Sequence, residues 1–148
     1  MKIPSRARYS AGFTLIEIMV VVIIIGLLAA VVVPQFLNRV DDARVAKAKQ
    51  DIQAIETALT MYKLDNFTYP TAEQGLQALV TKPEDSTIKN WRTGGYLKRL
   101  NKDPWGNDYQ YAVPGTHSSD YDLYSQGADG QQGGEGTAAD VGNWNLDQ

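Results

Sequence analysis

The chain has 148 residues, of which 43% are hydrophobic and 21% are charged, a composition that excludes a wholly disordered chain and a polytopic membrane protein. It contains no cysteine and one histidine, His117, which excludes disulfide frameworks, thiol catalysis and multi-histidine zinc sites. The net charge of -3 is unevenly distributed, because residues 103–148 contain eight acids and no lysine or arginine. This acidic third argues against nucleic-acid binding and favours a bound cation.

The N-terminal segment combines a basic leader with a long apolar run. Residues 1–12 carry three bases and no acid, and residues 13–33 form a stretch whose single charge is Glu17. As a helix this stretch covers roughly 30 Å, the thickness of a bilayer core. A secretory signal peptide is the alternative, but its apolar region usually has only about 7 to 15 residues. The positive-inside rule predicts that the N-terminus lies in the cytoplasm and that residues 34–148 lie on the opposite, outer side of the membrane.

Glu17 places a carboxylate inside this predicted span. At the bilayer centre it would cost about 2.5 to 3.5 kcal/mol on insertion scales, and acids within membrane spans usually have a function. The alternative is that Glu17, close to the start of the span, lies at the headgroup level and costs little. The residues alone leave both interpretations open.

The segment after the span has the pattern of an amphipathic helix. It contains neither glycine nor a second proline from Pro34 to about Leu64, and apolar side chains recur at three- and four-residue spacing at Ile52, Ile55, Leu59 and Tyr62. We therefore predict one continuous helix over residues 13–64. A membrane anchor that tethers an unrelated domain would show a flexible Gly/Ser/Pro linker, and this segment has none.

The following residues predict a small α+β head. Thr71 and Gln74 have the spacing of a capping box, which predicts a short helix that ends near Lys82. Residues 84–102 show no period and predict a loop anchored by Trp91, Tyr96 and Leu97. Alternating side chains in residues 109–113 and 121–125 predict an antiparallel hairpin packed on the amphipathic helix.

The tail over residues 126–142 is rich in glycine and acidic residues. Carboxylates and glycine-rich backbone carbonyls can together supply the oxygen ligands that calcium prefers. The spacing does not match an EF-hand, which needs acids at alternate positions and a closing glutamate. Composition alone therefore favours a calcium site and a poorly ordered acidic loop equally.

The leader and the start of the span carry a family resemblance. They resemble the class III signal of type IV pilins and pseudopilins in the hexapeptide Gly12-Phe13-Thr14-Leu15-Ile16-Glu17. The resemblance implies that a prepilin peptidase cuts between Gly12 and Phe13 and methylates the new N-terminus. It divides the chain into a leader (1–12), a transmembrane helix (13–33) and a head (34–148). It also assigns Glu17, the fifth mature residue, to assembly.

The body of the chain is similar to the major pseudopilins of type II secretion systems. The similarity rests on motifs spread over the mature chain, among them Tyr69-Pro70-Thr71, Asp103-Pro104-Trp105-Gly106, Gly127-Ala128-Asp129-Gly130 and Asp140-Val141-Gly142-Asn143-Trp144. It implies the type IV pilin-like fold, an α+β architecture in which the long N-terminal helix packs on a small antiparallel sheet that is followed by a C-terminal calcium loop.

The function implied by this resemblance is structural, not enzymatic. Such subunits polymerise into a periplasmic pseudopilus that drives the export of folded proteins across the outer membrane. The implied partners are the inner membrane, prepilin peptidase, an assembly platform, minor pseudopilins and other copies of this chain. One alternative is a major type IV pilin for adhesion or motility, although many of those have a disulfide that this chain cannot form. Another is a membrane-anchored enzyme, for which the sequence offers no catalytic cluster.

The resemblance also implies a calcium ion in the C-terminal loop. Residue by residue, Asp129 and Asp140 match aspartate ligands, while the backbone carbonyls of Gln126 and Thr137 match main-chain ligands. Some members have a further aspartate where this chain has Ala139. This departure leaves three alternatives open, namely a weaker site, a water molecule in this position, or another oxygen such as that of Glu135.

Overall fold

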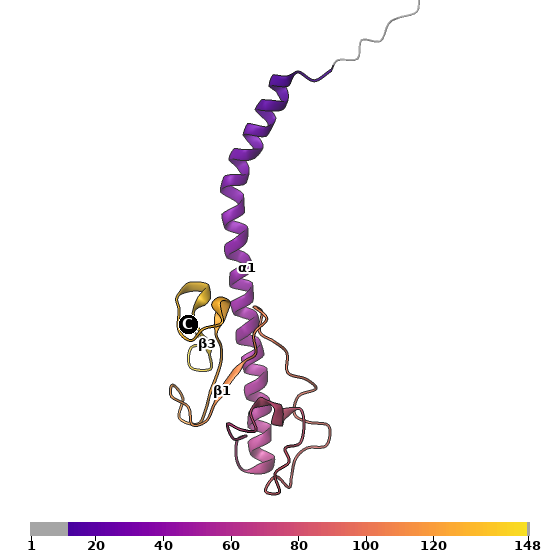
Figure 1. Ribbon diagram of the computed structural model, residues 1–148, viewed down its shortest axis with the longest axis vertical. Coiled ribbons are helices and arrows are strands. Elements are labelled where there is room, and N and C mark those ends of the chain that lie inside the picture. Colours follow the sequence, from indigo (N-terminus) through magenta and orange to yellow (C-terminus); the bar gives the residue numbers. More distant parts are fainter. Residues whose placement is uncertain (1–11, 148) are drawn as a thin grey trace, which may run out of the picture. The chain divides into compact units, whose positions relative to one another are not determined.

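The computed structural model of the protein describes residues 12–147, except for the side chains of residues 34–38. The chain divides into two compact units, Met1–Arg39 and Val40–Gln148, and the second is called the head below. Figure 1 follows the elements in chain order, with η denoting a 3-10 helix: α1 (Leu15–Asn66), η1 (Leu76–Leu79), β1 (Gln110–Ala112), β2 (Asp122–Ser125), η2 (Gly127–Asp129), η3 (Gly136–Ala138) and β3 (Val141–Gly142).

Helix α1 confirms the predicted continuous helix. It has 52 residues, as predicted, but it begins and ends two residues later than the predicted range 13–64. The stretch Leu15–Val33 has a mean hydropathy of 3.2, none of it is buried within the chain, and it is the one candidate membrane span among the described residues. An apolar surface of this size requires lipid or other protein chains to cover it.

The second half of α1 carries the core of the head. Five of its buried side chains lie three or four residues apart and share one face of the helix, where Ala58 is buried beside them: Ala48, Ile52, Ile55, Leu59 and Tyr62. This face packs against buried side chains from the rest of the head, namely Leu76, Leu79, Ile88, Tyr109, Tyr121, Leu123 and Val141. Because burial of one large aliphatic side chain contributes roughly 1.5 to 3 kcal/mol, this face holds the loops and strands on the helix.

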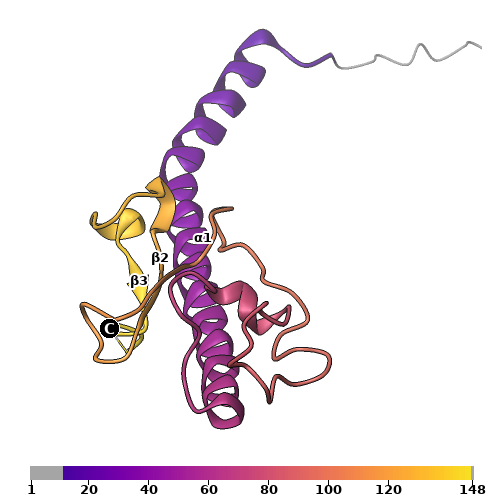
Figure 2. The ribbon, with the colours of Figure 1, turned by 60° about the horizontal axis from the view of Figure 1, so that its bottom comes forward.

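The sheet has three antiparallel strands in the order β1-β2-β3, which lie beside the head portion of α1 (Figure 2). Tyr111 pairs with Leu123 in the predicted hairpin, and Tyr124 pairs with Gly142 in the second ladder. The hydroxyl of Tyr109 donates a hydrogen bond to Asp51 of α1 (3.2 Å), and that of Tyr121 donates to Glu56 (3.3 Å). Strand β3 was not predicted, because it lies at the end of the glycine-rich tail and its two residues are too few to show the alternation of a strand.

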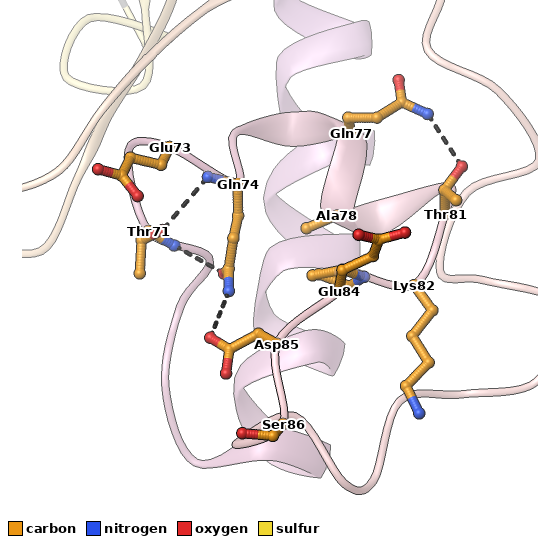
Figure 3. A pocket seen from close by; sticks show the side chains of 11 residues that line it. Thr71, Glu73, Gln74, Gln77, Ala78, Thr81, Lys82, Glu84, Asp85 and Ser86 are labelled. Carbon is orange, nitrogen blue, oxygen red and sulfur yellow. Dashed lines mark hydrogen bonds between the residues drawn. The ribbon is translucent and has the colours of Figure 1, made fainter.

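The predicted capping box forms at Thr71 and Gln74 (Figure 3). Gln74 N donates to Thr71 Oγ1 (3.2 Å), and Thr71 N donates to Gln74 Oε1 (3.0 Å). The helix that follows is shorter than predicted, because it consists of η1 alone. Gly75 has a positive φ of 56°, a backbone conformation that interrupts a regular α-helix at this point and that glycine adopts readily.

The segment between η1 and β1 contains neither helix nor strand, as predicted for residues 84–102. Its aromatic anchors are in place. Trp91 Nε1 donates to the carbonyl of Ala78 (2.8 Å), and the backbone amides of Tyr96 and Leu97 both donate to the carbonyl of Leu79. These bonds hold the segment on η1.

A buried carboxylate organises the loop between β1 and β2. Asp122 is 2% exposed and accepts hydrogen bonds from the backbone amides of residues 116–118, with the shortest at 2.7 Å from Thr116 N. Burial alone would raise the pKa of Asp122, but these amides and the Thr116 hydroxyl lower it well below its ordinary value. His117, predicted to be a surface histidine, is half exposed, lies 3.1 Å from Asp122 and stacks on Trp144.

We expect Asp122→Asn to destabilise the head by about 2 kcal/mol at pH 7, because an amide group cannot accept all of these bonds and would place a donor against donors. The lowered pKa means that Asp122 stabilises the fold above its unfolded pKa of about 4, and that this stabilisation is lost as the pH falls toward the folded pKa. Thermal unfolding of the detergent-extracted chain should therefore show a large gap between wild type and variant at pH 7 and a smaller one at pH 3. Equal gaps would contradict this role.

Candidate functional site

The first predicted site lies at the start of the described chain. Gly12 has no atom within 4 Å of the position where a Cβ would lie, and Phe13 is 85% exposed. The residues that the structure describes therefore do not shield the predicted cleavage bond between them. Residues 1–11 of the predicted leader lie outside the described residues.

Glu17 takes part in a second capping box, at the N-terminus of α1. Its Oε2 accepts hydrogen bonds from Thr14 N (2.8 Å) and Thr14 Oγ1 (2.9 Å), and Glu17 N donates to Thr14 Oγ1 (3.3 Å). The Thr-x-x-Glu spacing is the signal in the sequence that indicates this contact. A carboxylate in this position also complements the positive end of the helix dipole.

The second predicted site lies in the tail of the head. Gln126 immediately precedes η2, Asp129 ends η2, Thr137 lies within η3, and Asp140 immediately precedes β3. Helices η2 and η3 pack against each other. The fold therefore brings together the two segments on which the four predicted ligands lie.

Asp140 contains the clearest signal for a missing ligand. Its Oδ2 accepts a hydrogen bond from Gly133 N (2.9 Å), whereas its Oδ1 is buried and has no hydrogen-bond partner among the described residues. A buried carboxylate oxygen without a partner costs free energy unless a donor or a cation reaches it. The unpartnered Oδ1 of Asp140 therefore fits the predicted role of this residue as a cation ligand.

Asp129 is exposed, and its Oδ1 accepts a hydrogen bond from Gln131 N (3.0 Å). No group of three or more acidic or histidine side chains that could hold a metal occurs among residues 12–147. A cation here would therefore need main-chain carbonyls and water beside the carboxylates, which suits calcium better than zinc.

Two glycines explain why the tail folds so tightly. Gly127 and Gly134 both have positive φ angles, and a Cβ at these positions would lie 2.9 Å and 2.5 Å from the carbonyl oxygen of Ala138. A larger residue at either position would push this backbone away. The glycines thus allow the main chain at Gly127 and Gly134 to lie directly against the backbone of Ala138.

A hollow of about 640 Å³ lies between the capping box and residues 81–86 (Figure 3). Asp85 crosses it to accept a hydrogen bond from Gln74 Nε2 (3.0 Å). The same side chain accepts bonds from the Thr87 hydroxyl and amide, which lower the pKa of Asp85. Its carboxylate thus fastens the loop to the capping box.

Comparison with known proteins identifies both parts of the chain. A family described as "Type II secretion system (T2SS), protein G" matches residues 35–144, and the "Prokaryotic N-terminal methylation motif" matches residues 7–33. The type II secretion system core protein G of Vibrio cholerae is 58% identical over 141 residues, which cover 95% of this chain and 96% of that protein. The core protein G of Pseudomonas aeruginosa is 60% identical over 140 residues, or 94% and 98% of the two chains.

A solved structure extends the likeness to the fold. The major pseudopilin from the type 2 secretion system of enterohaemorrhagic Escherichia coli matches with a TM-score of 0.65 and 47% identity, over 76% of this chain and 96% of that one. This match confirms the predicted pilin-like α+β fold. Together the matches favour a structural secretion-system subunit over a type IV pilin for adhesion and over a membrane-anchored enzyme. The chain belongs to the protein G family of type II secretion systems, the family of the major pseudopilins.

Proposed function

We propose that this chain polymerises into a periplasmic pseudopilus and that growth of this fibre drives folded proteins across the outer membrane. The observation that carries the proposal is the division of α1. Its first half exposes an apolar surface on all sides, and its second half buries one face in a head. Lipid covers the first half in the membrane, and copies of the same helix would cover it in a fibre.

The orientation follows from charge and processing. Lys2, Arg6 and Arg8 precede the span, so the positive-inside rule keeps the N-terminus in the cytoplasm and places the head in the periplasm. A prepilin peptidase would then meet the bond between Gly12 and Phe13 at the cytoplasmic surface. An inner-membrane assembly platform and minor pseudopilins complete the proposed set of partners.

Gly12→Val should block cleavage and methylation, because a β-branched side chain would occupy the place that the peptidase reserves for a small residue. Among residues 12–147 there is room for a side chain at Gly12, so the variant should still fold and insert. Electrophoresis and N-terminal sequencing of the membrane fraction would test this. Unchanged processing of Gly12→Val would contradict the proposed cleavage site.

The calcium site is part of the proposal. Asp129 and Asp140 would supply carboxylate oxygens, and the backbone carbonyls of Gln126 and Thr137 would supply neutral ones. The bound ion would hold the segment around η2 and the segment around η3 together, because both would supply oxygen ligands to it. The partnerless, buried Oδ1 of Asp140 and the close approach of the backbone at Gly127 and Gly134 support this assignment.

Fibre formation tests the structural function directly. Overproduction of this chain together with its secretion system should yield surface fibres, visible by electron microscopy, in which this chain is the main protein by mass spectrometry. Fibres without this chain, or secretion that continues normally after its gene is deleted, would contradict the proposal.

A further inference from the structure

Asn145, which follows the proposed ligand Asp140 by five residues, bridges two parts of the C-terminal turn. Its Nδ2 donates a hydrogen bond to the main-chain carbonyl of Asp140 (3.0 Å), and its Oδ1 accepts one from Gly142 N (2.9 Å). Its own backbone amide donates to the carbonyl of Gly142 (3.1 Å). One side chain thus ties the residue before β3 to the strand itself.

The turn that contains Asn145 is itself fixed to the sheet. Gly142 pairs with Tyr124 of β2, and Asn143 exchanges hydrogen bonds with Leu123 through its amide and its side chain (2.9 and 3.1 Å). Trp144 stacks on His117 with ring centroids 4.0 Å apart. The backbone of Asn145 is therefore held in place by the sheet, and its side chain can restrict the position of Asp140.

Asn145 holds the main-chain carbonyl of Asp140 and Gly133 N holds its Oδ2, while its buried Oδ1 has no partner among residues 12–147. Fixing two of its oxygens limits the directions in which the third can point. A carboxylate that is already aimed loses less conformational freedom when it binds a cation, so the affinity rises.

We propose that Asn145 is a positioning residue that aims the free Oδ1 of Asp140 at the calcium ion and thereby sets the affinity of the loop for calcium. The inference rests on the calcium site proposed above. Asn145 would not touch the ion. It would act through the main chain of Asp140.

The chain offers a matched control. Asn143, two residues away, also donates its Nδ2 to a main-chain carbonyl, that of Tyr121 (3.3 Å), and also accepts a backbone amide with its Oδ1. Asn145→Asp and Asn143→Asp each keep the acceptor, lose the donor and add one charge. Only the first loses a bond to Asp140.

The experiment is a calorimetric titration of calcium chloride into the detergent-extracted full-length chain, after exhaustive chelation, with circular dichroism as a check of folding. Because one lost hydrogen bond changes an equilibrium by up to about tenfold, Asn145→Asp should raise the calcium Kd about fivefold to tenfold. Asn143→Asp should leave it within about twofold of wild type. The neutral variant Asn145→Ala, which adds no charge, should raise the calcium Kd likewise.

A purely structural role predicts a different pattern. Both asparagine variants would then lose similar thermal stability in chelator and keep the wild-type Kd. An unchanged Kd in Asn145→Asp, or an equal loss of affinity in Asn143→Asp, would overturn the positioning role while the calcium site stands. If wild type itself binds no calcium, the proposed site fails, and the role of Asn145 fails with it.

Discussion

Glu17→Ala should insert into the membrane and be cleaved normally, yet fail to form fibres and to support secretion. Cleavage would expose a cationic amine on Phe13 inside or near the bilayer. The carboxylate of Glu17 on a neighbouring subunit could neutralise this amine as the helix leaves the lipid for the fibre. Without the carboxylate one buried charge is left without a partner, which costs about 3 to 5 kcal/mol per contact and is repeated at every subunit.

The structure allows this role to be separated from helix capping. Glu17 also accepts hydrogen bonds from Thr14, and glutamine can serve in the same capping box. Glu17→Gln should therefore keep the helix start but lose the charge, and should fail in assembly as Glu17→Ala does. Sheared-fibre yield and exoprotein secretion, compared at equal membrane levels, measure both variants.

Two different outcomes would contradict the role of the Glu17 charge in assembly. Normal assembly of Glu17→Gln together with failure of Glu17→Ala would assign Glu17 to capping alone. Normal assembly of both would mean that the carboxylate merely rests at the headgroup level.

Removal of calcium should lower the stability of the head strongly. The folded chain would bind the ion and the unfolded chain hardly at all, so that calcium at 100 times its Kd adds about 2.7 kcal/mol. For a head of this size this corresponds to a fall in melting temperature of about 10 °C on chelation. Asp129→Ala and Asp140→Ala should each abolish most of this calcium-dependent difference, with a larger effect at Asp140, since its Oδ1 is buried.

Asp147→Ala is the matched control, because it removes an exposed acid of the same tail that is outside the proposed ligand set. It should keep the full difference between calcium and chelator. Equal melting temperatures of wild type with and without calcium would contradict the site. If Asp147→Ala lost as much of the calcium-dependent difference as the two ligand variants, the stabilisation would come from general screening of the acidic tail and not from a specific site.

The sequence revealed α1 and the hairpin because their signals are periodic. The apolar residues of α1 repeat at helical spacing over many turns, and alternation marked β1 and β2. The two-residue strand β3 has no period of its own and depends on its pairing with Tyr124 and Ser125. The helix predicted after Thr71 shrank to η1, because the positive φ of Gly75 outweighed the capping signal.

The candidate sites were predictable to different extents. The hexapeptide around Gly12 is a local signal, so that its match to the methylation motif could be expected. The tail gave only its composition, and the ligand assignments came from resemblance. The partnerless Oδ1 of Asp140 and the support from Asn145 depend on contacts across the C-terminal turn, which no spacing in the sequence reveals. The cluster around Asp122 was missed for the same reason.

The intact mass and N-terminal sequence of the membrane-extracted protein test the central claim most directly. We expect a chain of residues 13–148 that begins with a methylated Phe13 and remains in the membrane fraction. An unprocessed chain that still begins at Met1, or a soluble chain cut after the apolar segment, would contradict it.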